Sequence, residues 1–338
     1  MDTEISYDHY IAVDWSIRNM AIARMTARSN KITVMDVSSD VAELQMYLKS
    51  LKGKKILAIE ETTTSQWLYT ELKDHVDRIF ICDPYRNKLL SEGTKTDKID
   101  ASKLVQLLKA NLLKEVFHSV DRFLDLRRVV SGYEDLVKAG VRLKNQRYSL
   151  LRACGLSGKE KKGIVRLKGS GDQLVLECLE RQIESYEKEK EAYEAEFAKL
   201  RKRYPEIRHQ DSLPGIGIIG AIKIVSQVVS PRRFADSGHF LSYAGLIKLE
   251  KKSGGVSYGR KTPRYCRRLK SVYKMAALAT IGGNNVFNNY YEYLIQKKGY
   301  PDYQARHKVS RRLAVLSWGI FKSGEKYRRD PIEESQEV

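Results

Sequence analysis

The stretch Lys95-Thr96-Asp97-Lys98-Ile99-Asp100-Ala101 is the one around which this chain of 338 residues is organised. It opens a segment whose apolar residues recur at helical spacing as far as Leu113. Two acids three positions apart face the same way on a helix, so Asp97 and Asp100 are expected to share one face. Taken alone, the pattern also suits an ordinary acidic first turn, because carboxylates stabilise the positive end of the helix dipole.

Residues 1–115, which contain this stretch, predict an α/β domain. Five runs are short, apolar and typical of strands. They are Tyr10–Val13, Met20–Met25, Lys31–Val37, Lys55–Ile59 and Arg78–Cys82. Helical spacing lies between the later runs. The order strand, strand, strand, helix, strand, helix, strand, helix favours an antiparallel meander followed by parallel crossover strands.

Two further acids stand at the ends of predicted strands. Asp14 ends the first strand, and Glu60 ends the strand that follows the first helix. Parallel strands bind ligands at their carboxyl ends, so we expect these two acids to meet Asp97 and Asp100 there. Glu61 points to the opposite face of the pleat from Glu60, and we favour Glu60 because it directly follows the apolar run.

A set of four carboxylates without histidine or thiolate is hard-oxygen chemistry, which suits Mg²⁺, with Mn²⁺ as the alternative. Two such ions can activate a nucleophile and stabilise the leaving oxygen of a phosphodiester. Each acid alone could instead be a helix cap or a solvated strand end. The combination of all four in this order, in a strongly basic chain, favours the metal site.

Charge is the strongest signal in the composition. Lys and Arg total 61 against 42 Asp and Glu, a formal net charge of +19. Such an excess indicates a polyanionic partner, most often nucleic acid. The four cysteines are scattered without a CxxC pair, which argues against a zinc site and a disulfide framework. Without a long apolar run or a signal peptide, the protein is expected to be cytoplasmic, with no membrane partner.

The middle of the chain, residues 116–205, predicts two long helices. A linker rich in glycine and lysine, residues 155–171, joins them. Apolar residues of the second helix alternate by three and four, which is the heptad seam of a coiled coil. They are Leu176, Leu179, Ile183, Tyr186, Tyr193, Phe197, Leu200 and Tyr204, with Lys190 as one polar position. The seam could pair with the first helix or with another protomer, and we favour dimerisation.

Residues 206–328 predict a mostly helical domain that opens with Leu213-Pro214-Gly215-Ile216-Gly217. This turn is similar to the hairpin of helix-hairpin-helix modules, where backbone N–H groups hold a DNA phosphate, so Gly215 and Gly217 are candidate contacts. Similar turns also serve plain helix packing. The acidic tail, residues 329–338, is expected to be disordered.

The densest cationic stretch runs from Lys251 to Lys274, with nine basic residues and no acid. Phosphate-backbone contact is the natural interpretation of such a stretch. The candidate contacts are Lys251, Lys252, Arg260, Lys261, Arg264, Arg267 and Arg268. Within it, Ser253 precedes two glycines and should be exposed and flexible. A lone Ser-Gly-Gly is more often a simple hairpin turn.

Together these landmarks resemble the DEDD transposases of bridge-RNA-guided insertion sequences, a family that includes the Piv-type invertases. The resemblance spans nearly the whole chain. It rests on Val13-Asp14, Ile59-Glu60, Lys95-Thr96-Asp97-x-x-Asp100-Ala101, Leu213-Pro214-Gly215-Ile216-Gly217, Arg233-Phe234, Tyr243-Ala244-Gly245-Leu246, Ser253-Gly254-Gly255 and Lys322-Ser323-Gly324.

The resemblance implies a RuvC-like (RNase H-type) N-terminal domain, a coiled-coil middle and a C-terminal transposase domain. It implies that Asp14, Glu60, Asp97 and Asp100 bind Mg²⁺ and that Ser253 attacks a DNA phosphate to give a phosphoserine intermediate. It also implies a structured non-coding guide RNA that pairs with donor and target DNA. The family's dimer assembles into a tetramer, in which the acids of one subunit act with the serine of another.

One departure from the family concerns the residues after Gly259-Arg260. The family usually continues Ser-Lys-x-Gly, and this chain has Lys261-Thr262-Pro263-Arg264. Ser257 is a fallback nucleophile. The runner-up function is a metal-dependent nuclease or junction resolvase, which needs only the four acids and water. The third hypothesis is an inactive protein that only binds nucleic acid. The amino-acid sequence does not specify the DNA sites or the guide RNA.

Overall fold

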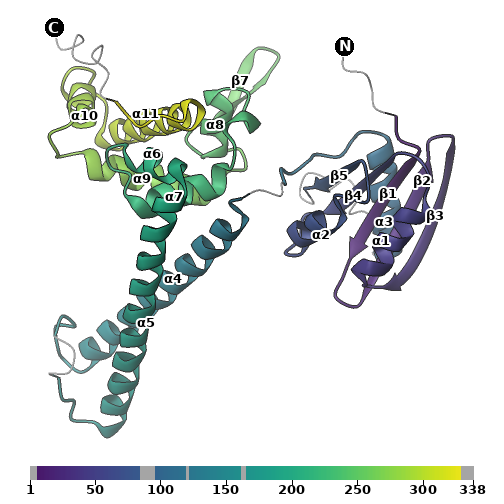
Figure 1. Cartoon of the computed structure of the whole chain (residues 1–338). Helices are drawn as coiled ribbons and strands as arrows, with labels where there is room; N and C mark the ends of the chain where they lie inside the picture. The colour runs from purple at the N-terminus through teal and green to yellow at the C-terminus, as the bar shows by residue number, and fades with distance from the viewer. Residues whose placement is uncertain (1–5, 84–95, 119–121, 161–164, 329–338) are drawn as a thin grey trace. The chain divides into compact units, whose positions relative to one another are not determined.

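The computed structural model describes residues 6–83, 96–118, 122–160 and 165–328. Lys95, part of the glycine-rich linker and the acidic tail lie outside these ranges. The chain divides into two compact units, residues 1–121 and 122–338, each with its own hydrophobic core (Figure 1). Within the described ranges, no helix combines the length and the apolar character that a membrane span requires.

The first unit is built on a mixed five-stranded sheet of order β3-β2-β1-β4-β5. The strands are β1 (His9–Trp15), β2 (Asn19–Thr26), β3 (Ser29–Ser38), β4 (Lys55–Glu60) and β5 (Arg78–Cys82). The pairs β1–β2 and β2–β3 are antiparallel, and β1–β4 and β4–β5 are parallel. This confirms the predicted meander followed by crossover strands, and it is compatible with a RuvC-like DEDD domain.

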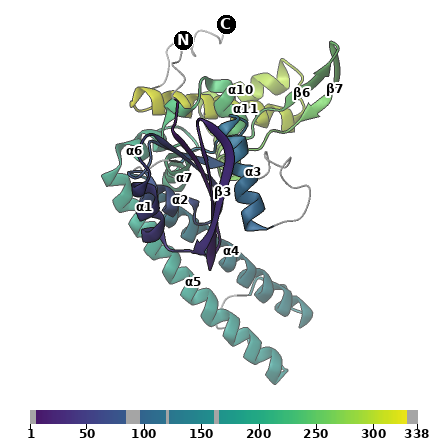
Figure 2. The same cartoon turned by 90° about the vertical axis from the view of Figure 1, so that its right-hand side faces the viewer.

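The helices of this unit cover both faces of the sheet (Figure 2). α1 (Val41–Ser50) and α2 (Ser65–Leu72) pack on one face, where the inward side chains are large and aliphatic. α3 (Asp97–Lys109) packs on the other face. Small side chains fill the sheet on the α3 side, namely Ala12, Ala21, Ala23 and Ala58. Because alanine takes little space, α3 can approach β1 and β2 closely.

The second unit begins with a helical hairpin, α4 (Leu124–Ala153) and α5 (Ser170–Arg203), whose helices lie side by side in Figures 1 and 2. They run antiparallel, because Tyr133 stacks near Tyr193 at one end while Arg147 pairs with Glu180 at 3.0 Å towards the other. Gly140 lies against the Tyr186 ring, where a Cβ would overlap it.

The predicted seam of α5 is therefore buried inside this chain. Leu176 is 1% exposed and Phe197 is also 1% exposed within the single chain. The preference for dimerisation through this seam was wrong, since α4 already covers it, and the intrachain pairing is the one observed. Whether the pair supercoils as a coiled coil stays a prediction.

The remainder of the second unit is a helical bundle with one protruding hairpin. Its elements are α6 (Pro205–Asp211), α7 (Ile218–Val228), η2 (Pro231–Arg233), α8 (Ser237–Tyr243), β6 (Leu249–Ser253), β7 (Val256–Lys261), α9 (Arg267–Thr280), α10 (Val286–Gln296) and α11 (Asp302–Ser323). A buried hydrogen-bonded set ties α6, α9 and α11 together. The Ser317 hydroxyl donates to Gln210 Oε1 at 2.6 Å and lies 2.8 Å from the Tyr273 hydroxyl.

Candidate active site

Strand register brings Asp14 and Glu60 together. Val13 and Ile59 are partners in the parallel β1–β4 pair, and the two acids directly follow them. Ala12 and Ala58, two positions earlier, both face α3. Because side chains alternate along a strand, Asp14 and Glu60 project to this same face at the carboxyl ends of their strands. They lie where α/β sheets commonly bind ligands.

The first turn of α3 supplies the other two acids. Thr96 caps the helix, since its hydroxyl accepts a hydrogen bond from the Ile99 N–H at 3.3 Å. Asp97 lies one turn before Ala101 and Asp100 one turn before Leu104, and both of those residues are buried against the sheet. Residues four apart share a helix face, so both acids lie on the sheet-facing side of the helix start.

Three contacts fix α3 against the sheet. At its start, Lys98 Nζ lies 3.5 Å from Asp36 Oδ2 of β3. At its end, Lys109 Nζ donates to the backbone oxygens of Thr26 at 2.9 Å and Ser29 at 3.0 Å. These contacts hold the helix at both ends, so the acidic first turn has a defined position relative to the strand ends.

The acids act on one another electrostatically. Burial raises the pKa of Asp14 from its ordinary 3.8 to about 6, and repulsion from Asp97, Glu60 and Asp100 adds to the rise. Carboxylates raise one another's pKa only at short range, so the repulsion indicates that Asp97, Glu60 and Asp100 lie near Asp14. The structure thus brings the four predicted acids to one edge.

The same four acids can be tested as a metal site. Among the described residues, no three His, Cys, Asp or Glu side chains lie grouped tightly enough to enclose a metal ion. Mg²⁺ does not need such a cage, since it is usually held by one or two carboxylates, several waters and substrate phosphates. An all-oxygen set whose charges repel each other fits that mode of binding, because a cation would relieve the repulsion.

Glu60 and the adjacent Glu61 make different contacts. The Glu61 N–H donates to the Cys82 carbonyl at 2.9 Å and extends the β4–β5 ladder by one bond. Repulsion at Asp14 involves Glu60. Asp83, which is not among the acids predicted from the sequence, is 4% exposed directly after β5. An acid at the end of a third buried strand was the signal that could have marked it.

Ser253 lies in the second unit, at the end of β6. It pairs with Val256 of β7, so Gly254 and Gly255 form a two-residue hairpin loop. Their φ angles are +55° and +79°, the left-handed values that the favoured two-residue turns demand. All residues of both strands are exposed. Ser253 is accessible, and its Ser-Gly-Gly sequence also satisfies the simpler hairpin-turn reading.

The predicted phosphate contacts divide into exposed and structural cations. Lys251, Lys252, Arg260, Lys261, Arg264 and Arg267 are exposed. Arg268 is partly buried, and its Nε donates to Glu134 Oε2 of α4 at 2.5 Å. Lys223 Nζ lies 3.1 Å from the other oxygen of Glu134. Arg268 therefore anchors α9 to α4. The sequence did not predict this ion pair, because Glu134 is far from Arg268 along the chain.

The two predicted glycine contacts lie in the connection between α6 and α7. Gly215 has a φ of +78°, and its Cα packs against the Ala276 carbonyl oxygen of α9. Gly217 is the N-cap residue of α7. Close packing accounts for Gly215 by itself, whereas Gly217 stands beside the free N–H groups of a helix start.

Comparisons with known proteins agree with these landmarks. A DEDD transposase family model of the IS110 type, described as "Transposase", matches residues 11–155. The model of the "Transposase IS116/IS110/IS902 family" matches residues 209–292. The "Insertion element IS110 uncharacterized 43.6 kDa protein" of Streptomyces coelicolor is 26% identical over 165 residues. That match covers 48% of this chain and 40% of the Streptomyces protein.

The two family models match successive parts of the chain. The first covers most of the first unit, with the sheet, α3 and all four acids, and extends into the second unit as far as the end of α4. The second runs from α6 into α10 and includes the hairpin that carries Ser253. Both transposase domains are present in the order in which the sequence presents its motifs, so the chain carries the two domains of a DEDD transposase of the IS110 type.

Proposed function

We propose that this chain cuts and joins DNA strands as a divalent-metal-dependent transposase. The observation that carries the proposal is the convergence of Asp14, Glu60, Asp97 and Asp100 on one sheet edge, with the pKa of Asp14 raised to about 6. The net charge of +19 supports a nucleic-acid substrate. The presence of both transposase domains supports DNA, in the form of a donor and a target.

Mg²⁺ or Mn²⁺ is the proposed cofactor, held by the four acids with waters and a substrate phosphate. When bound, such an ion makes an oxygen nucleophile more reactive and stabilises the charge of a leaving oxygen. The protein's own part is to hold the carboxylates in position, through the Thr96 cap and the Lys98 and Lys109 contacts of α3.

Ser253 is the proposed nucleophile. Its Oγ forms a bond to the phosphorus of a DNA phosphodiester, and one backbone P–O bond breaks. The proton lost by the serine hydroxyl is balanced by the one gained by the released sugar hydroxyl. Attack of another strand's sugar hydroxyl on the phosphoserine reverses these steps, so strands are exchanged without net hydrolysis. Nearby exposed cations, such as Lys252 and Arg260, stabilise the phosphate charge.

A structured guide RNA that pairs with both DNA partners is the proposed source of sequence recognition. The proposed assembly is a dimer that forms a tetramer, with the acids and the serine of each reacting site supplied by different subunits. The family resemblance supports both points. The location of Ser253 in a different compact unit from the acids is compatible with a shared site.

A covalent-trapping assay tests this function. Purified protein and RNA transcribed from the flanking non-coding region are mixed with labelled donor and target duplexes in Mg²⁺. We expect a protein–DNA adduct on a denaturing gel, lost in Ser253→Ala and Asp97→Ala. Ser257→Ala, in the same exposed hairpin, is the matched control and should keep the adduct. An adduct that survives Ser253→Ala but not Ser257→Ala would reassign the nucleophile.

A nuclease or junction resolvase is the second candidate, and one observation favours it. The loop at Gly254 and Gly255 has the backbone geometry of an ordinary hairpin, which explains the Ser-Gly-Gly sequence without chemistry. In that case water attacks the phosphate in place of the serine. DNA cleavage without an adduct, unchanged by Ser253→Ala and abolished by Asp97→Ala, would establish the nuclease.

A further inference from the structure

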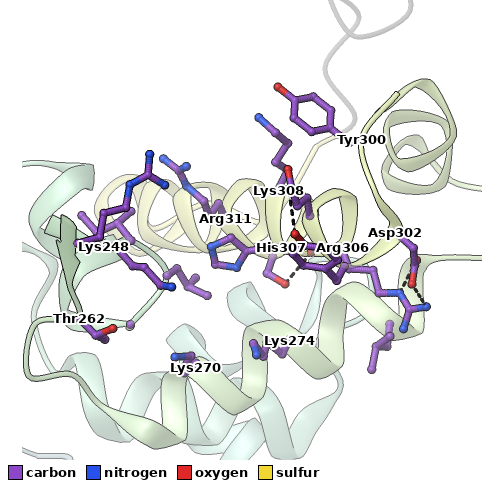
Figure 3. Close-up of a pocket in the computed structure, with 18 residues that line it drawn as sticks. Lys248, Thr262, Lys270, Lys274, Tyr300, Asp302, Arg306, His307, Lys308 and Arg311 are labelled. Carbon is purple, nitrogen blue, oxygen red and sulfur yellow. Dashed lines mark hydrogen bonds and ion pairs between the residues drawn. The ribbon is translucent and has the colours of Figure 1, made fainter. Parts of the chain in front are cut away.

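A large concave site lies in the second unit, whereas the four acids belong to the first. We call it the cationic cleft; its volume is about 1110 Å³, and its walls include Lys248, Lys270, Lys274, His307, Lys308 and Arg311 (Figure 3). One wall is α9 and the opposite wall is α11. The connection between α8 and β6, together with the end of β7, closes a third side.

The charge of this cleft is one-sided. Of the described residues that line it, seven are Lys or Arg, and Asp302 is the acid. Asp302 already accepts a hydrogen bond from Arg306 Nε at 2.6 Å and another from the Tyr291 hydroxyl at 2.6 Å. Arg306 and Asp302 thus neutralise each other, and the remaining cations face the cleft without a lining acid among the described residues. An anionic ligand is the expected occupant.

The cations are arranged along both walls, not around one point. Lys270 and Lys274 are one turn apart on α9, and His307 and Arg311 are one turn apart on α11. Residues at this spacing share a helix face, so each helix presents a pair to the cleft. Figure 3 shows the two lysines rising from α9 towards the space in which His307 lies. Charges spread in this way suit a chain of phosphates better than a single phosphate.

Aromatic side chains accompany these charges. Tyr303, in the first turn of α11, lines the cleft and is 70% exposed. Tyr300 also lines it, with Lys308 Nζ 4.4 Å from the centre of its ring. A cationic groove beside exposed aromatic rings is the general form of a single-strand binding site, because unpaired bases can stack on the rings.

The size of the cleft limits the ligand. Its volume is slightly above the range of pockets that hold small molecules, so a few nucleotides can enter it. The cleft is also continuous with the hairpin of Ser253, since Arg260 of β7 lines its wall. Arg260 lies four positions along β7 from Val256 at the turn, or about 13 Å along a strand.

From these observations, the geometry points to a binding site for a short single-stranded segment of the DNA substrate, held through its phosphates between α9 and α11 with a base stacked on Tyr303. The choice of DNA rests on the proposed function, because the strand leaving the cleft along β7 would lead to Ser253. Opening a DNA duplex beside the reacting phosphate would produce such a single-stranded segment.

Fluorescence anisotropy of the full chain in EDTA tests this site without turnover. The probe is a short labelled oligo-dT strand, compared with a duplex and an oligo-rU strand of the same length. We expect Lys270→Gln with Lys274→Gln to weaken oligo-dT binding by at least about tenfold and to reduce the salt slope by about 1.4, since each phosphate contact contributes about 0.7. Lys270→Arg with Lys274→Arg keeps the charge and should bind normally.

The matched control removes two exposed lysines from the helical hairpin, Lys138→Gln with Lys188→Gln, and should change the affinity by less than about twofold. Tyr303→Ala should weaken oligo-dT binding by about five- to a hundredfold, and Tyr303→Phe should restore it. Equal losses in the cleft and control variants, or an equal loss for duplex and single strand, would overturn the site.

A loss confined to oligo-rU would also overturn the assignment, because it would make the cleft an RNA site. Failure of the proposed function is distinguishable from failure of this site. A protein that forms no serine adduct but whose oligo-dT binding depends on the cleft would lose its assignment as a serine transposase and keep the single-strand site. If a cleft variant binds oligo-dT normally and still forms the adduct, only the proposed single-strand site is overturned, and the proposed function stands.

Discussion

Asp14 and Glu60 follow the register partners Val13 and Ile59 at the ends of two parallel strands, and their side chains project to the same face of the sheet. The alternation of the pleat makes this a consequence of the backbone, so it does not depend on a particular rotamer. α3 then places two more carboxylates above that face. The edge is consequently a site of charge repulsion in the folded protein.

The pH dependence of stability should report this repulsion. The pKa of Asp14 is about 6 in the folded protein against an ordinary 3.8, so the folded state binds this proton more tightly than the unfolded state. Stability therefore falls as pH rises between about 4 and 6, and the full penalty is present above that window. Asp14→Asn should raise the melting temperature at pH 7.5 in metal-free buffer, and the gain should shrink towards pH 4. A lower melting temperature at pH 7.5 would contradict the repulsion.

Divalent cations should stabilise the native protein through the same acids. At 100 times the dissociation constant, one bound ion adds about 2.7 kcal/mol to the free energy of unfolding. We expect Mg²⁺ or Mn²⁺ to raise the melting temperature of the unmodified protein at pH 7.5 and to have little effect on Asp97→Asn with Asp100→Asn. Glu60→Gln should lose part of the response, and Glu61→Gln should keep it. The reverse order would move the ligand to Glu61.

The buried hydrogen bonds between α6, α9 and α11 give a stability prediction for the second unit. Ser317→Ala removes the group that contacts both Gln210 and Tyr273, and so leaves buried polar atoms without their partner. The expected loss is about 1–3 kcal/mol in the free energy of unfolding, measured by urea titration. Ser271→Ala, exposed on α9, is the control and should change little. Equal effects would mean that the buried set adds nothing.

Mixed assemblies can test whether acids and serine come from different subunits. Asp97→Ala and Ser253→Ala are each expected to form no adduct alone. When the two proteins are mixed and allowed to exchange subunits, one type of shared site has both functional groups, and the adduct should reappear. A mixture that exchanges subunits but stays inactive would show that each site belongs to one chain.

His307 predicts a pH effect on single-strand binding. Burial lowers its pKa, and Arg311, Lys274 and Lys270 lower it further, while a hydrogen bond with the Leu246 backbone raises it. Phosphates in the cleft would offset these cations and raise the pKa, so binding takes up a proton. Affinity for oligo-dT should rise as pH falls from 8 to 5, a range that includes the ordinary pKa of histidine. His307→Gln should flatten this dependence, and an unchanged slope would exclude His307.

Local sequence patterns predicted the parts of the molecule that depend on neighbours along the chain. The five strands and the start of α3 followed from runs such as Lys55–Ile59, whose burial matches their apolar content. The meeting of Asp14 and Glu60 followed from strand order. In each case the hydrophobic period and the connection rules left few alternatives.

Contacts between remote segments could not be predicted in this way. Arg268 looked like one more exposed cation, and its partner Glu134 lies on a helix far away in the sequence. The heptad pattern of α5 is compatible with either partner. The sequence also does not reveal that Gly140 of α4 leaves room for the Tyr186 ring. The cationic cleft draws its walls from four separate segments, so no single stretch of sequence marks it.

The exposure of the β6–β7 hairpin has a consequence for when the protein can react. A two-stranded hairpin with no buried side chain is only marginally stable in water, so its amide hydrogens should exchange with solvent early. On the proposed mechanism, such a hairpin would leave the Ser253 hydroxyl distributed over many positions in the free protein, and contact with a nucleic-acid strand would lower this conformational entropy. The hydroxyl would then be held in place while the strand is bound, which would confine cleavage to assembled complexes.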